Sequence, residues 1–239
     1  MANDVVDVRD RVSRRQQLPE EVASYVRELI ISGQVQPGEF LRMERIAEQV
    51  GVSNTPVREG LLALRSEGFV QLVPRRGFVV APFTRQDVRD LFWAQAQLAG
   101  ELAARTARKI TPGQLARLEA NLEQFQKALA AGAEERIADL GHAFHREINL
   151  AADSRRLALL LGAVVKHLPN RFYASIEAQV AAAGGEHPQL VEALRQHNAR
   201  KARSLMEQHI LGGADHLIEI LEERGLWGAA EADAQEPAS

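Results

Sequence analysis

Three histidines stand at positions where their imidazole nitrogens could act together: His145, His187 and His209. The residues that share a helix face with each of them are small or apolar, so all three side chains are predicted to point inward. Three neutral imidazoles suit Zn²⁺, Ni²⁺ or Fe²⁺ and leave coordination positions for water or another ligand. The alternative is that each is a separate, hydrogen-bonded core histidine.

Spacing favours the metal site over that alternative. His187 and His209 each lie 11 residues from Asn198. If the chain turns back near Asn198, two antiparallel helices carry both rings at the same height, about 16 Å from the turn. His145, on a third helix, would complete the site, and His142 is the best rival ligand because it lies one turn earlier. The other histidines are predicted to be surface or supporting groups: His167, His197 and His216.

The region that must position these rings, residues 82–227, reads as an all-helical bundle. Apolar residues recur at helical spacing, no convincing strand interrupts them, and Pro169 is expected to kink the fourth helix. The predicted helices are 84–108, 111–132, 134–152, one that starts after Asp153-Ser154, 187–196 and 199–223. Residues 228–239 are small and acidic and are predicted to form a disordered tail.

A second group of side chains suits nucleic acid. Residues 18–81 read as three helices, the first opened by Pro19, and two short strands, which is the order of a winged helix-turn-helix. An α-helix fits the major groove, and Arg58 lies one turn inside the third helix. Ser53 and Thr55 stand at its N-terminus, where free N–H groups suit a phosphate. The hairpin tip carries Arg75, Arg76 and Gly77. Any one of these arginines could instead be solvated surface charge.

Composition sets limits on the function. The chain has 239 residues, a net charge of -3 and no cysteine. It can hold two domains, and it lacks the means for disulfides or thiol chemistry. No window approaches 18 uninterrupted apolar residues, and the polar N-terminus is unlike a secretory signal. We therefore expect a mainly α, cytoplasmic protein with no membrane span and with a flexible arm over residues 1–17.

The stretches GVSNTPVREGLLALRSEGFV and PRRGFVV resemble the DNA-binding domain of GntR-type bacterial transcription regulators. The resemblance implies that Arg45, Arg58 and the wing around Arg76-Gly77 contact DNA, with Ser53 and Thr55 assisting. Family members usually carry arginine at the position of Asn54. Asparagine can read adenine through two hydrogen bonds, so an altered operator sequence is expected.

The stretches FHREINLAADSRRL and EHPQLVEALRQHNARKARSLMEQHI resemble the metal-binding FCD effector domain of the FadR-type branch. The resemblance implies a three-histidine site at His145, His187 and His209, often with an aspartate one turn before the first. That position is Gly141 here, so three protein ligands are expected. Asp139 should lie on the wrong face. The family's arginine and glutamate near Gln95 and Ala99 are also replaced.

The leading prediction is a homodimeric transcriptional repressor, released from operator DNA by a small hydroxy or keto acid. The predicted effector contacts are Arg171, Tyr173 and Asn149. One alternative is a metal-dependent enzyme fused to a DNA-binding domain, for which Glu147 and Glu186 are the neighbouring carboxylates. Another is a DNA-binding protein that needs no effector and retains a vestigial pocket.

Overall fold

The computed structural model of the chain describes residues 2–168, 176 and 186–227, with side chains from residue 17 onward. Its contacts divide the chain into two compact units. The first comprises residues 1–84 together with 221–239, and the second comprises residues 85–220. Residues 221–227 were expected to belong to the helical bundle, but contacts group them with the first unit.

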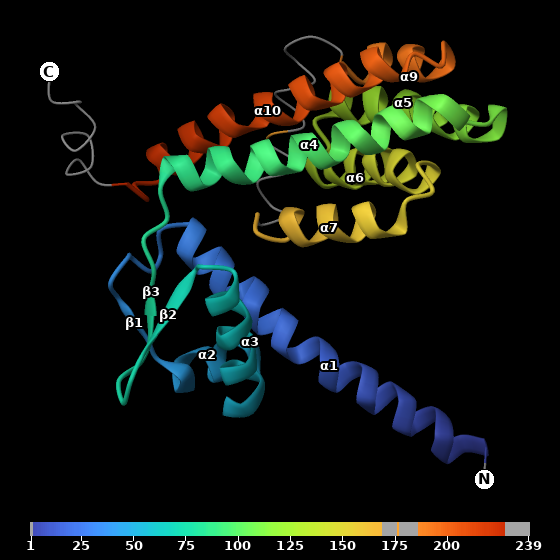
Figure 1. Cartoon of the computed structure of the whole chain (residues 1–239). Coiled ribbons are helices and arrows are strands. Elements are labelled where there is room, and N and C mark those ends of the chain that lie inside the picture. Colours follow the sequence, from blue (N-terminus) through green and yellow to red (C-terminus); the bar gives the residue numbers. More distant parts are fainter. Residues whose placement is uncertain (1, 169–175, 177–185, 228–239) are drawn as a thin grey trace, which may run out of the picture. The chain divides into compact units, whose positions relative to one another are not determined.

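Three helices form the body of the first unit: α1 (Ala2–Ile31), α2 (Met43–Val50) and α3 (Asn54–Ser66) (Figure 1). The fully buried apolar side chains of α1 and α3 face each other across the core: Val22, Ala23, Val26, Ile31, Val57, Leu61 and Leu64. Gly60 lets α3 approach α1 closely, because a Cβ there would lie 2.7 Å from the carbonyl oxygen of Pro19. This packing determines which face of α3 remains outside.

The beginning of α1 corrects a sequence-based expectation. A flexible arm over residues 1–17 and a helix starting at Pro19 were predicted, whereas the helix begins at Ala2 and contains Pro19. Proline is favourable in the first turn of a helix. Inside a helix it removes one backbone hydrogen bond, and its ring clashes with the carbonyl group four residues earlier. The residues before it include arginines and glutamines, which have good helix propensity, so the helix can extend past it.

A small antiparallel sheet completes the first unit, with strand order β1-β3-β2. The hairpin of β2 (Val70–Val73) and β3 (Gly77–Val80) was predicted, and it pairs Val73 with Gly77 next to the tip. Gly77 has φ 103°, and Arg75 has φ 63°, so the turn needs left-handed backbone at both positions. The two-residue strand β1 (Phe40–Leu41) was missed, because two residues carry no readable alternation.

Residues that follow α10 pack against this unit. Leu226 and Trp227 are buried, and the indole Nε1 of Trp227 donates a hydrogen bond of 2.5 Å to the carbonyl oxygen of Phe83. A Cβ at Gly33, two residues after α1, would lie 3.5 Å from the carbonyl oxygen of Arg224 and 3.8 Å from Cα of Leu226. The segment after α10 therefore packs on the residues that lead out of the wing.

The described residues of the second unit form helices joined by turns, with no strand among them, as predicted. Its helices are α4 (Arg85–Lys109), α5 (Pro112–Ala131), α6 (Glu134–Ala151), α7 (Arg155–Val165), α9 (Glu186–Arg195) and α10 (Ala199–Glu223), whose last residues belong to the first unit. Thr111 and Gln114 form a capping box at the start of α5, and Gly132 ends it in the left-handed region. Pro169 lies outside the described residues. Within them, no helix combines the length and apolar character needed to cross a bilayer.

Candidate functional site

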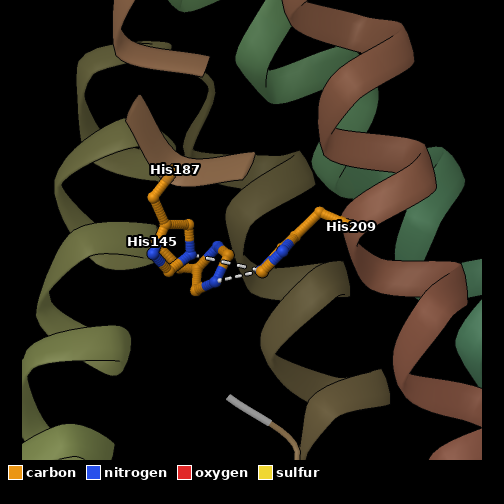
Figure 2. A group of neighbouring side chains, drawn as sticks. All are labelled: His145, His187 and His209. Carbon is orange, nitrogen blue, oxygen red and sulfur yellow. Dashed lines mark hydrogen bonds between the residues drawn. The ribbon is translucent and has the colours of Figure 1, made fainter. Parts of the chain in front are cut away.

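The three predicted histidines converge within the second unit, from three different helices (Figure 2). The Nε2 atom of His209, on α10, lies 3.1 Å from Nε2 of His145 on α6 and 3.3 Å from Nε2 of His187 on α9. His187 and His209 are buried, and His145 is half-buried. The equal spacing of His187 and His209 from Asn198 therefore does bring the two rings together, because Asn198 lies between α9 and α10.

The distances suit a shared metal ion. Two nitrogen ligands of a tetrahedral Zn²⁺, each about 2.0–2.1 Å from the ion, lie roughly 3.3 Å from each other. The two measured Nε2 separations fall close to that value, and one ligand atom from each histidine lies within 4.8 Å of the others. The three residues could thus hold a divalent ion without large rearrangement of their side chains.

Aromatic side chains form one wall of the cluster. The ring of Phe144 lies 4.3 Å from the ring of His187, and the ring of Phe125 lies 5.3 Å from it at a steep angle. Both phenylalanines are buried. This wall leaves His187 little freedom to rotate, and it excludes water from that side of the imidazole.

The carboxylates near the cluster have different partners. Oε2 of Glu186, the first residue of α9, lies 3.0 Å from Nδ1 of His209. Glu147, on α6, instead accepts two hydrogen bonds from the guanidinium of Arg117, at 3.0 and 2.7 Å. This ion pair raises the pKa of Arg117. The position of Glu186 was not resolved by the sequence, because its partner lies 23 residues away on another helix.

Other predicted members of the site are distributed as follows. Within the described residues, the group of three histidines forms with His145 rather than with His142. Gly141 is buried one turn before His145, and Asp139 is exposed. The Oδ1 atom of Asn149 is buried and makes no hydrogen bond with the residues that the structure describes. Arg171 and Tyr173 lie outside the described residues.

The predicted DNA contacts of α3 lie on its outer side. Ser53 is the N-cap residue, and Gly51, with φ 74°, makes the left-handed turn that separates α2 from α3. Asn54, Thr55 and Arg58 are exposed, whereas the opposite face of the helix is buried against α1. The side chain of Ser53 makes no cap hydrogen bond to this helix. The first turn of α3 therefore presents both polar side chains and backbone N–H groups.

The remaining predicted contacts lie on α2 and on the wing. Arg45, Arg75 and Arg76 are exposed, and Gly77 is half-buried at the start of β3. The guanidinium carbon of Arg76 lies 4.5 Å from the centre of the Phe40 ring. Phe40 belongs to β1, which pairs with β3, so the missed strand supplies a surface on which this arginine stacks.

Comparison with known proteins matches both units. Residues 18–80 match the family of bacterial regulatory proteins called the gntR family, and residues 90–212 match the FCD domain. The chain belongs to the GntR family of bacterial regulators and carries an FCD domain. This assignment agrees with the predicted fold class, a winged helix-turn-helix followed by an all-helical domain.

Relatives of this GntR protein are transcriptional regulators. The chain is 28% identical over 204 residues to the HTH-type regulator YdhC of Bacillus subtilis strain 168, covering 83% of this chain and 90% of that one. It is 31% identical over 183 residues to the Glc operon transcriptional activator of Escherichia coli K12, covering 68% and 71% of the two chains. The structure of E. coli McbR superposes with a TM-score of 0.62 at 24% identity, covering 87% and 98%.

Membership in this family distinguishes the predicted transcriptional regulator from the predicted enzyme. The GntR protein is a DNA-binding transcriptional regulator rather than an enzyme, since the matching family and the named relatives are regulators. FCD domains typically bind metal, and this one has a histidine triad able to hold an ion.

Proposed function

We propose that the protein is a homodimeric repressor that leaves its operator when a small hydroxy or keto acid binds beside a divalent metal ion in the FCD domain. The observation that carries this proposal is the convergence of three Nε2 atoms from α6, α9 and α10 in a partly buried cluster. Because DNA is its partner, we place the regulator in the bacterial cytoplasm.

The metal would be held by His145, His187 and His209, and Zn²⁺, Ni²⁺ or Fe²⁺ fits such donors. When bound, the ion would supply positive charge and open coordination positions for a carboxylate with an adjacent hydroxyl or carbonyl oxygen. Asn149 supports an effector site next to it, because its buried Oδ1 lacks a partner within the described residues, and the residue follows His145 by one turn of α6. Arg171 and Tyr173 remain proposed contacts outside the described residues.

For DNA, we propose that Arg58 reads base edges from the exposed side of α3 and that the wing arginines contact the backbone. Base readout by one arginine is worth about 1–3 kcal/mol, whereas a phosphate contact adds affinity that falls with salt. The full set of proposed DNA contacts is Arg45, Ser53, Asn54, Thr55, Arg58, Arg75, Arg76 and Gly77.

The exposed face of α7 supports the proposed homodimer. This helix has the sequence RRLALLLGAVV, yet Leu161 is its only buried residue. Leu159 is 59% exposed and Leu160 is 50% exposed, which is costly for adjacent leucines in water. A second copy of the chain would cover them and would pair two DNA-binding units for a palindromic operator.

Sedimentation tests the dimer directly. The wild-type protein should sediment as a dimer at micromolar concentration, and the Leu159→Asp, Leu160→Asp double variant should sediment near the monomer mass of 26.4 kDa with unchanged circular dichroism. A monomeric wild type would contradict the proposal.

The effector mechanism is tested on operator DNA selected from fragments of the source genome. Fluorescence anisotropy would follow release of the operator by a panel of hydroxy and keto acids, with and without a chelator. Arg58→Ala should weaken operator binding by about 5–150-fold if it reads a guanine, and the exposed Arg200→Ala on α10 serves as the control. Release that does not depend on metal, or no release by any acid, would contradict the mechanism.

Repression is tested separately, because the Glc operon relative is named an activator. A promoter reporter should rise when the gene is deleted. A fall in reporter output would show activation instead, while leaving the metal and the effector proposals intact.

A further inference from the structure

His209 is the central member of the histidine cluster, and its two ring nitrogens have different surroundings. Its Nε2 atom lies within 3.3 Å of both other histidines. Its Nδ1 atom lies 3.0 Å from Oε2 of Glu186, while the imidazole is 5% exposed. One nitrogen therefore faces the other imidazoles and the opposite nitrogen faces a carboxylate.

A neutral imidazole carries one N–H donor and one lone pair, so its tautomer decides which nitrogen can bind a metal. An ionised carboxylate only accepts hydrogen bonds. The pairing with Glu186 consequently favours the proton on Nδ1 of His209 and leaves the Nε2 lone pair directed at the cluster. Carboxylates that hold metal-ligating histidines in this way also increase the basicity of the ligating nitrogen.

We propose that Glu186 is a positioning residue of the metal site, which acts through His209 and does not bind the metal itself. This inference rests on the proposed metal site. Glu186 precedes His187 in the sequence, so the first two residues of α9 provide one ligand and the acceptor that orients a ligand on α10. The hydrogen bond thereby joins α9 to α10 at the metal site.

Three substitutions separate the possible roles of Glu186. Glu186→Ala removes the acceptor. Glu186→Asp keeps the negative charge at the start of α9, and with it the favourable interaction with the helix dipole, but shortens the reach by one methylene. Glu186→Gln keeps the length and a neutral acceptor oxygen. Glu192→Gln, on the same helix, is the matched control, because its carboxylate pairs with Arg195 and Gln196.

Metal affinity of the full-length protein is measured for Zn²⁺ by competition with a chromophoric chelator. Glu186→Ala and Glu186→Asp should each lose about 10–100-fold in affinity, which is the usual cost of removing such a partner. Glu186→Gln should lose less than either, and Glu192→Gln should bind like the wild type. The visible spectrum of the Co²⁺-loaded protein should keep its band positions in Glu186→Gln, since the set of ligands is unchanged.

Wild-type affinity in both Glu186→Ala and Glu186→Asp would overturn the proposal. So would a Glu186→Gln variant that loses as much affinity as Glu186→Ala and shifts the Co²⁺ bands, because Glu186 would then be a ligand.

A metal-free readout keeps this inference separate from the metal site itself. In ¹⁵N-labelled apoprotein, His209 should be the Nδ1–H tautomer, and Glu186→Ala should shift it toward the Nε2–H form. If the wild type binds no Zn²⁺, the proposed metal site fails, but this tautomer still tests the positioning role. An unchanged tautomer in Glu186→Ala would overturn that role.

Discussion

The two units of the protein present their functional side chains in opposite ways. In the DNA-binding unit, Arg45, Arg58 and Arg76 are exposed, and the helix that carries Arg58 is anchored by a buried apolar face. In the FCD domain, His187 and His209 are buried and face each other across two helices. The first arrangement suits a large polyanion outside the protein, and the second suits a small ligand inside it.

This difference shows how each site depends on the fold around it. An exposed arginine on a helix needs only a correctly oriented helix, since its long side chain can adjust to a phosphate or a base. The histidine cluster depends on the positions of α6, α9 and α10. These helices must hold the three imidazole nitrogens within about 0.5 Å of the separation that a shared metal ion requires. We therefore expect packing changes to affect the metal site more sharply than the DNA surface.

The largest expected effect is loss of the metal in the His145→Ala, His187→Ala double variant. Elemental analysis should find about one ion per chain in the wild type and nearly none in the double variant, because one imidazole alone cannot retain it. His142→Ala is the control and should keep its metal. In the absence of metal, the double variant and the wild type should bind the operator with affinities that agree within about two-fold. Full metal content in the double variant would rule out this site.

The next effect concerns the packing that orients α3. Gly60→Ala should destabilise the N-terminal unit by about 1–3 kcal/mol, because the new Cβ meets a backbone oxygen at 2.7 Å and Val22 at 2.9 Å. In a Trp93→Phe background, the buried Trp227 alone would report urea unfolding of this unit. Gly212→Ala, where a Cβ meets nothing within 4 Å, is the control. Equal stability of the two variants would contradict the close approach.

A smaller effect is expected where Arg76 stacks on Phe40. Phe40→Leu should weaken operator binding by about two- to five-fold, since a cation–π contact at an exposed site contributes about 0.5–1 kcal/mol. Phe40→Tyr should bind like the wild type. In the Arg76→Ala background the Phe40→Leu change should have no further effect, which a double-mutant cycle measures. Additive losses would show that the two residues act independently.

The smallest effect concerns Glu101 in the FCD domain, which bridges Arg105 on its own helix and Arg203 on α10. The hydrogen bond from Arg105 lowers the pKa of Glu101, although burial opposes the shift. A lowered folded-state pKa stabilises the protein above the unfolded-state pKa, and this stabilisation disappears as pH falls through the folded-state value. The Glu101→Gln variant should therefore have a slightly lower melting temperature than the wild type at pH 7 and the same melting temperature in strong acid. A difference that persists in acid would contradict this.

Much of the fold could be predicted because the signals are local. The cap residue Thr111, the turn glycines Gly51 and Gly132, and the Pro-Arg-Arg-Gly hairpin each restrict only a few neighbouring residues. The bounds of the bundle helices followed from them to within a few residues. The helix start at Ala2 was missed, because a proline after a polar segment is compatible with both a start and a continuation.

By itself the sequence determined the order of the helices and the wing hairpin, the exposed arginines of the DNA-binding unit and the equal spacing of His187 and His209 about Asn198. These follow from periodicity and turn chemistry, which act over a few residues. Only the tertiary structure decided that Glu186 pairs with His209 and Glu147 with Arg117, and that Trp227 packs beside Phe83. Such partners are separated by 23 to 144 residues. The packing of whole helices chooses between them, and no local pattern in the chain records that choice.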